Sequence, residues 1–278
     1  VGGCGKPPGR SGVRSVILGQ FDHVPFDAAA LEANTAELGE VSRTELAALL
    51  DLADGFSEST MNDLTDPAWR EIAETTERAG KARAIHCLEN AGYRELSLAR
   101  TGRGDLLQAI ELYRPHLIVH LTVANDEEIE LLARHGVTAV LNPRANANLG
   151  LPLPPVARLL DAGVNLLLGT DNGLLNSPSL LAELDFTYKL AKSQYGNAVD
   201  PDPLKILSMA TSNVGQTFWG EELPGVLEPG RPANFVELDF HAPHLRHSAH
   251  LPASVLTRVT PEDVRLTVRE GAVIYRAD

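Results

Sequence analysis

Three apolar segments of this chain end in side chains that can bind a metal ion or transfer a proton. These side chains are His86, Glu89 three residues later, His120 and Asp171. Strands that are apolar throughout are typical of parallel sheets buried on both faces. In an α/β barrel the carboxyl ends of such strands carry the active site. Core packing does not require this combination of residues, so it indicates a catalytic site.

The chemistry that these residue types allow is the activation of water. Zinc and iron accept imidazole and carboxylate ligands, and a catalytic site leaves one position for water. A bound ion lowers the pKa of that water towards ~7, and attack on an unsaturated carbon then needs one proton removed and one delivered. His86 and Asp171 suit ligation. Glu89 suits a proton shuttle, and His120 can orient the water or hold the developing oxyanion.

The elements that would position these residues alternate between apolar strands and amphipathic helices, which predicts a parallel sheet with right-handed crossovers. Strands are predicted over residues 13–20, 54–59, 81–86, 117–120, 137–142 and 165–171. Helices are predicted over residues 27–38, 44–52, 66–80, 104–113, 125–136, 154–162 and 177–194, with further starts at Pro201 and Ser212. Asp66 is expected as an N-cap, and Asn125 with Glu128 as a capping box.

The C-terminal part of the chain has a different pattern of residues. It is turn-rich from Pro224, and residues 234–239, 264–268 and 272–275 alternate as short strands. We therefore predict two domains, with a boundary near residue 222. Residues 1–222 would form the α/β domain, and residues 223–278 a small β appendage.

Composition limits the class of protein. The 278 residues are 44% hydrophobic and 22% charged, with a formal net charge of −13, which argues against nucleic-acid and anionic-membrane partners. There is no apolar run of about 18 residues and no visible signal peptide. The two cysteines give no disulfide framework, and Cys87 is expected to pack. We expect a cytoplasmic protein that acts on a small molecule and could form a homo-oligomer.

Several motifs occur in an order and at spacings that are similar to one family. They are His86-Cys-Leu-Glu89, His120-Leu-Thr with Asp126-Glu-Glu-Ile-Glu-Leu-Leu, Asn142-Pro-Arg-Ala-Asn146, Pro152-Leu-Pro-Pro-Val-Ala-Arg-Leu-Leu-Asp-Ala-Gly163 and Gly169-Thr-Asp171. The chain resembles the amidohydrolase superfamily, in the branch of cytosine, guanine and adenosine-type deaminases and chlorohydrolases. Gly225-Val-Leu-Glu-Pro-Gly-Arg-Pro-Ala-Asn234 resembles the entry of that branch into its small β-sandwich.

The resemblance implies a fold and an activity. The fold would be a (β/α)8 TIM barrel of the metal-dependent hydrolase type, with part of a small β-sandwich at the C-terminus. The activity would be hydrolysis of C–N bonds, most simply deamination of a heteroaromatic or cyclic amine. One divalent metal ion, Zn or Fe, would be the cofactor.

The resemblance also implies a role for each site residue. His86 would be the fifth-strand metal ligand, Glu89 the proton shuttle and His120 the sixth-strand histidine near the water. Asp171 would be the eighth-strand ligand and base. Asn142 and Asn146 would face the substrate together with His120.

One departure from the family pattern is large, because the chain has no His-x-His, the first-strand motif that supplies two metal ligands. Counting back from Asp171 as strand eight makes residues 13–20 strand three. We therefore expect an N-terminally truncated barrel holding strands three to eight, and a 278-residue chain that is inactive by itself. Leu141 also stands where several deaminases of the family carry histidine, so the resemblance does not imply that this chain acts on their substrates.

Two other functions stay open from the sequence. A hydrolase of cyclic amides or imidazolones would use the same residues, and a truncated barrel relative could be non-catalytic. The remaining histidines are expected to be incidental. His23, His116 and His135 would be solvated or at helix ends, whereas those at positions 241, 244, 247 and 250 would lie in an irregular loop between prolines.

Overall fold

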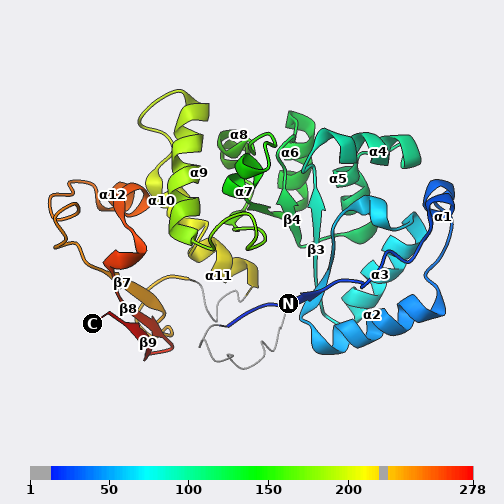
Figure 1. The fold of residues 1–278 in the computed structure, drawn as a ribbon, viewed down its shortest axis with the longest axis horizontal. Coiled ribbons are helices and arrows are strands. Elements are labelled where there is room, and N and C mark those ends of the chain that lie inside the picture. The colour runs from blue at the N-terminus through cyan, green and yellow to red at the C-terminus, as the bar shows by residue number, and fades with distance from the viewer. Residues whose placement is uncertain (1–13, 219–224, 278) are drawn as a thin grey trace.

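A parallel sheet of six strands organises the larger part of the molecule (Figure 1). The computed structural model describes residues 14–218 and 225–277. The strands lie in the order in which they occur along the chain, each parallel to the next. They are β1 (Leu18–Gly19), β2 (Gly55–Glu58), β3 (Ala82–Cys87), β4 (Leu117–His120), β5 (Thr138–Leu141) and β6 (Leu166–Leu168). The prediction of a six-stranded parallel α/β sheet is confirmed, although β1 is much shorter than expected.

Helices follow each strand, and the main helix layer packs on one face of the sheet (Figure 1). They are α1 (Ala28–Ala33), α2 (Glu40–Leu52), α3 (Asp66–Arg78), α4 (Ala91–Thr101), α5 (Asp105–Gln108), α6 (Asp126–His135), α7 (Pro143–Asn148), α8 (Val156–Asp161), α9 (Leu180–Tyr195), α10 (Pro203–Ser208) and α11 (Ser212–Phe218). A short 3-10 turn, η1 (Met61–Asp63), precedes α3, and a π-helical segment, η2 (Ala109–Tyr113), continues α5.

The helix ends test the capping predictions. The capping box of Asn125 and Glu128 is present at the start of α6. The N-cap of α3 is Thr65, whose side chain accepts from the Ala68 amide, so the prediction of Asp66 was wrong by one residue. Asp66 is instead the first helical residue, and its carboxylate contacts Gln108 of α5 and Arg103 in the α4–α5 connection. Helices α4 and α7 were not predicted.

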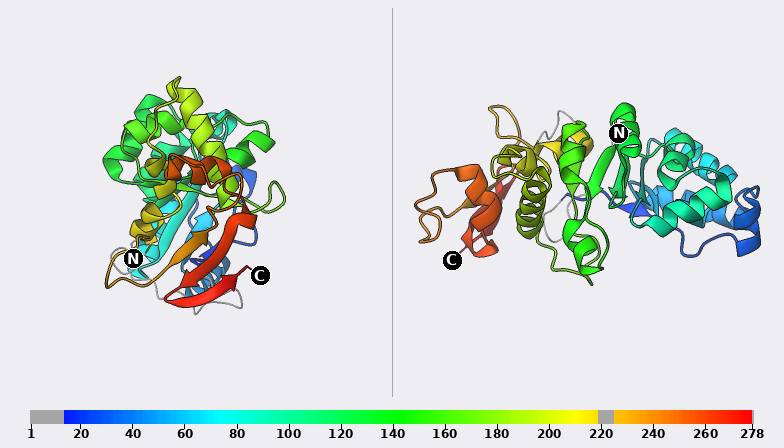
Figure 2. Two further views of the ribbon diagram at one scale, coloured as in Figure 1. Left: turned by 90° about the vertical axis from the view of Figure 1, so that its left-hand side faces the viewer. Right: turned by 90° about the horizontal axis from the view of Figure 1, so that it is seen from above.

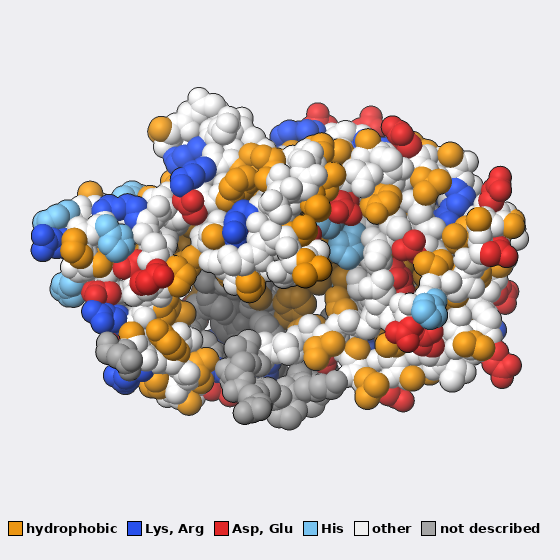
Figure 3. All heavy atoms as spheres, viewed as in Figure 1, with side chains coloured by type: hydrophobic (Ala, Val, Ile, Leu, Met, Phe, Trp, Pro, Cys, Tyr) orange, Lys and Arg blue, Asp and Glu red, His pale blue; other side chains and the backbone are white. Residues whose placement is uncertain are grey.

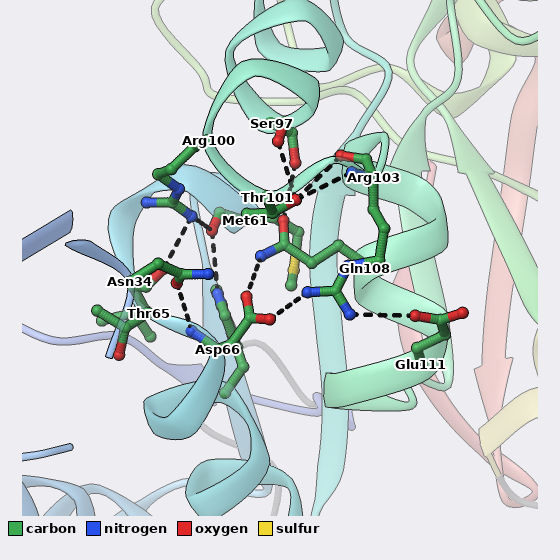
Figure 4. A network of polar contacts seen from close by, with 12 residues as sticks. Asn34, Met61, Thr65, Asp66, Ser97, Arg100, Thr101, Arg103, Gln108 and Glu111 are labelled. Carbon is green, nitrogen blue, oxygen red and sulfur yellow. Dashed lines mark hydrogen bonds and ion pairs between the residues drawn. The ribbon is translucent and has the colours of Figure 1, made fainter. Parts of the chain in front are cut away.

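Asp66 belongs to a polar network that joins α3 to the α4–α5 region (Figure 4). Its carboxylate accepts from Gln108 Nε2 at 2.8 Å and pairs with Arg103. The amide oxygen of Gln108 accepts from Ser97 Oγ at 2.8 Å. Both Ser97 and Gln108 are buried, so this network fixes the helix layer through polar contacts as well as apolar packing.

The main hydrophobic core lies between the sheet and its helices. Trp69 of α3 and Tyr113 of η2 are fully buried there, with ring centroids 4.8 Å apart. The Tyr113 hydroxyl donates to the Phe56 carbonyl of β2 at 2.7 Å. A smaller cluster on the opposite face of the sheet is built on Ala84 and Leu167. Side chains of the strands therefore alternate between two apolar environments, as a sheet covered on both faces requires.

A second, antiparallel sheet follows the first and lies at one end of the molecule, with α1–α3 at the other (Figure 2). Its strands are β7 (Phe235–Leu238), β8 (Val264–Arg269) and β9 (Ala272–Arg276), close to the predicted bounds. Between β7 and β8 lie α12 (Leu251–Arg258), which was not predicted, and η3 (Pro261–Asp263). The predicted boundary between residues 222 and 223 lies outside the described residues, so the two-domain division stays a prediction.

The six-stranded sheet is open in the part of the chain that the structure describes. There, β1 pairs with β2 alone and β6 with β5 alone. Within residues 14–218 and 225–277, no helix combines the length and apolar character needed to cross a bilayer.

Candidate active site

The carboxyl ends of β3 and β4 bring His86, Glu89 and His120 together. The rings of His86 and His120 have centroids 5.1 Å apart, and His120 Nε2 lies 3.9 Å from Glu89 Oε1. Asp171 follows β6 at the same edge of the sheet, and its charge acts on both Glu89 and His120. Near the middle of one face, histidine and carboxylate surfaces lie side by side (Figure 3). The structure thus places all four predicted side chains at one edge.

The backbone at these strand ends leaves regular β geometry. Leu88, His120, Leu121 and Asp171 have φ of 55°, 81°, 58° and 59°. Non-glycine residues rarely adopt positive φ, and such positions cluster at functional sites. His120 is the register partner of Cys87, which is buried in the main core as predicted. The change in backbone direction at His120 turns its ring towards His86 instead.

His86 is fixed by the neighbouring strand. Its Nδ1 lies 3.1 Å from the carbonyl oxygen of Glu58 at the end of β2. A metal-binding histidine commonly has its second ring nitrogen bonded to a backbone carbonyl, which leaves the other nitrogen for the ion. The contact therefore leaves Nε2 of His86 for a ligand.

Glu58 itself is a residue that sequence reasoning missed. Its side chain is buried, and burial raises its pKa to about 7. One carboxylate oxygen accepts from the Phe21 amide at 3.1 Å, which ties the end of β1 to the end of β2. The sequence did hold a signal for Glu58. It is a polar residue at the end of a short strand, β2, and the predicted site residues were found at or near strand ends in the same way.

His120 is buried and held by Asn146. It is 2% exposed, and its Nδ1 lies 3.1 Å from Nδ2 of the fully buried Asn146. Burial lowers the pKa of His120 to about 4, the nearby His86 adds to that shift, and Asp171 opposes it. His120 is therefore a neutral imidazole at pH 7. The contact with Asn146 fixes the orientation of the His120 ring. The predicted contact of Asn146 with substrate stays a prediction.

Glu89 is half-buried. Burial raises its pKa, the nearby His86 opposes the shift, and the Asp171 carboxylate adds to it. A carboxyl group with a raised pKa holds and releases a proton closer to neutral pH, which is the property that a shuttle needs.

Asn142 lies at the end of β5, buried against β6. With its amide nitrogen turned towards them, the carbonyl oxygens of Leu141 and Gly169 each lie 3.1 Å away. A side chain at Gly169 would collide with the side-chain amide of Asn142. Glycine at position 169 therefore lets the ends of β5 and β6 approach closely, and the predicted substrate contact of Asn142 remains untested.

The histidines that were expected to be incidental have other surroundings. His23 and His135 are exposed, and His135 ends α6. His116 was predicted to be solvated or at a helix end, but it is half-buried. Its Nδ1 accepts from the Arg83 amide at 3.0 Å. That bond joins the beginnings of β3 and β4.

The C-terminal histidines lie in turns before α12, as predicted. His244 pairs with Asp263 at 3.1 Å, and His250 caps α12. Within the described ranges, no three His, Cys, Asp or Glu side chains converge as a metal site, either here or at the sheet edge.

Comparison with known proteins places this arrangement in a family. The sequence profile of the Amidohydrolase family matches residues 13–274. The chain belongs to the amidohydrolase family. A relative from Methanothermobacter thermautotrophicus with a provisional aminohydrolase name is 33% identical over 264 residues, covering 95% of this chain and 63% of the relative. A 5-methylthioadenosine/S-adenosylhomocysteine deaminase from Syntrophobacter fumaroxidans is 34% identical, covering 68% of this chain and 44% of the deaminase.

A solved amidohydrolase-type structure shares the fold. A zinc-bound adenosine deaminase from Xanthomonas campestris superposes with a TM-score of 0.77 at 22% identity, over 83% of this chain and 55% of that one. The chain thus spans between about two fifths and two thirds of the length of the proteins it matches.

Proposed function

We propose that this amidohydrolase chain carries much of the active site of a metal-dependent hydrolase that deaminates a heteroaromatic or cyclic amine. The observation that carries the proposal is the meeting of His86, Glu89 and His120 at the carboxyl ends of β3 and β4. The deaminase name of the Syntrophobacter relative supports cleavage of a C–N bond. None of the relatives described above is named as a cyclic-amide hydrolase, so that alternative is not favoured.

One divalent ion, Zn or Fe, would be held by His86 and Asp171. The contact of His86 Nδ1 with the Glu58 carbonyl fits a ligand histidine. Imidazole with carboxylate is a donor set that both metals accept, and zinc is bound in the solved adenosine deaminase. When bound, such an ion makes hydroxide available at neutral pH. The sequence contains no His-x-His, so these residues would be only part of the ligand set.

The side chains of this chain would divide the proton transfers between them. Glu89 takes a proton from the water and delivers it to the leaving nitrogen. Neutral His120 orients the water or the developing oxyanion, and Asp171 acts as a base. Asn142, the N-cap of α7, and Asn146 within α7 would shape the substrate side of the site.

The assignment of the strands to a barrel and a small β-sandwich is also a proposal. The six strands would be strands three to eight of a (β/α)8 barrel, and β7–β9 part of a small β-sandwich. The deaminase name of the Syntrophobacter relative supports a small-molecule substrate. The absence of nucleic-acid and membrane partners stays a prediction. A cytoplasmic location and a homo-oligomer remain predictions.

The test uses the full-length protein and measures ammonia release on a panel of purine, pyrimidine and triazine amines. We expect turnover of at least one amine. His86→Ala and Asp171→Ala should lower bound metal and abolish turnover, whereas His23→Ala, at an exposed position, should change neither. Unchanged metal content and activity in the first two variants would contradict the assignment.

A further inference from the structure

Thr122 connects the strand end that carries His120 with the loop that carries Glu89. It is 5% exposed, and its Oγ1 lies 2.6 Å from the Glu89 carbonyl oxygen and 3.1 Å from that of Leu88. We propose that Thr122, together with Asp105, is a positioning residue that clamps the Leu88–Glu89 backbone so that the Glu89 carboxylate faces His120. This inference rests on the proposed role of Glu89.

Asp105 holds the other side of the same backbone. It is fully buried at the start of α5, and its Oδ2 accepts from the Leu88 amide at 2.7 Å. Leu88 has φ of 55°, a left-handed conformation that a leucine does not adopt without tertiary support. A buried carboxylate on the amide and a hydroxyl on the carbonyl supply that support from two different elements.

The backbone bonds around the clamp explain why Thr122 matters most for Glu89. The Leu121 amide donates to Cys87, and the Val123 amide donates to Leu88, each at 3.2 Å. These bonds bring the end of β4 beside the loop, but they stop one residue short of Glu89. Among the described residues, the hydrogen bond from the end of β4 to the Glu89 carbonyl is donated by the Thr122 side chain. A shift of the Glu89 backbone would move the carboxylate away from His120.

Loss of the Thr122 hydroxyl would misalign the Glu89 carboxylate without weakening substrate binding. Displacement of a catalytic group by about 1 Å can cost on the order of 10²-fold in rate. Thr122 is buried behind the loop, so its hydroxyl is expected to act on kcat and to leave KM nearly unchanged. Thr122→Val keeps the shape and removes the hydroxyl, whereas Thr122→Ser keeps the hydroxyl.

The first experiment is a double-mutant cycle in the full-length enzyme with the best amine of the panel. Thr122→Val should lower kcat by about 10-fold or more with KM within about 3-fold, and Thr122→Ser should stay within about 3-fold of wild type. In a Glu89→Gln background, Thr122→Val should cost less than about 2-fold further, because its effect passes through Glu89. Equal losses in both backgrounds would show a merely structural role and overturn the proposal.

The second experiment does not depend on activity. Hydrogen exchange of a peptide covering residues 86–93 should be faster in Thr122→Val and in Asp105→Asn, with unchanged exchange elsewhere in the sheet. Thr187→Val is the matched control, because Thr187 is also buried and its hydroxyl has no hydrogen-bond partner among the described residues. Exchange equal to that of wild type in Thr122→Val would overturn the clamp. Faster exchange in an enzyme that releases no ammonia would instead retain the clamp and contradict the proposed function.

Discussion

His120 shows at the scale of one residue how this site is built against local preference. Among the described residues, seven non-glycine positions have positive φ, and four of them lie at the ends of β3, β4 and β6 or just after them. Each such position costs on the order of 1–3 kcal/mol and persists only where its surroundings impose it. For His120 those surroundings are Asn146, His86 and Glu89. The site is therefore held by tertiary contacts and not by the strands alone.

The residue-scale prediction concerns Glu89. Glu89→Gln keeps the shape of the side chain but cannot shuttle a proton, so kcat should fall by ~10²-fold or more. Metal content should be unchanged, because Glu89 is not proposed as a ligand. Steady-state kinetics and metal analysis of one preparation measure both. Glu95→Gln, at an exposed position of α4, is the matched control, and a Glu89→Gln enzyme within a few-fold of it would remove Glu89 from the mechanism.

At the scale of elements, the helix layer is joined by the network around Gln108 (Figure 4). Gln108→Leu would leave Ser97 Oγ and one Asp66 oxygen without their partner, both in buried surroundings. We expect the free energy of unfolding to fall by about 2–3 kcal/mol, since unpaired buried polar groups carry their full desolvation cost. Chemical denaturation measures this. Gln216→Leu, at an exposed position of α11, should stay within about 0.5 kcal/mol of wild type, and an equal loss in both variants would contradict a role for the network.

A second prediction at this scale concerns the pairing of β3 with β4. Burial lowers the pKa of His116, Arg83 adds to the shift, and the neutral ring accepts the Arg83 amide. Because the folded pKa lies below the unfolded value of about 6.5, the unfolded state takes up a proton first as the pH falls. His116 thus stabilises the protein fully above pH ~6.5, and that contribution is lost as the pH falls towards the lowered pKa.

The measurement for His116 is the free energy of unfolding at pH 7.5 and 5.5. The loss on acidification should be smaller in His116→Gln than in wild type. His23→Gln, at an exposed position, should retain the wild-type loss. Identical pH dependence in all three proteins would mean that His116 titrates alike in the folded and unfolded states.

At the scale of the whole molecule, the described sheet leaves one side of β1 and one side of β6 unpaired. Exposed strand edges invite pairing with another chain. We predict that the polypeptide of residues 1–278, expressed by itself, associates or aggregates, binds metal weakly and releases no ammonia. Light scattering, mass spectrometry of bound metal and the amine panel test this. A monodisperse monomer with stoichiometric metal and turnover would show that the strands were miscounted and that another histidine completes the site.

The sequence by itself was sufficient for features that depend on neighbours along the chain. The apolar runs predicted six parallel strands, because a strand buried on both faces has a local signature. The capping box of α6 was predicted because both partners lie within one turn. The positions of His86, Glu89, His120 and Asp171 at or just after the ends of three predicted strands predicted their common edge, because parallel strands end on the same side.

Only the tertiary structure decided the features that depend on distant residues. Helix α4 was missed because it exposes Leu96 and Leu98 and buries little besides Ser97, so it shows no apolar stripe. Asp105 and Thr122 contact the Leu88–Glu89 segment across 17 and 33 residues, which no local pattern reports. Left-handed backbone at a leucine or a histidine opposes local preference, so it can arise only from such contacts.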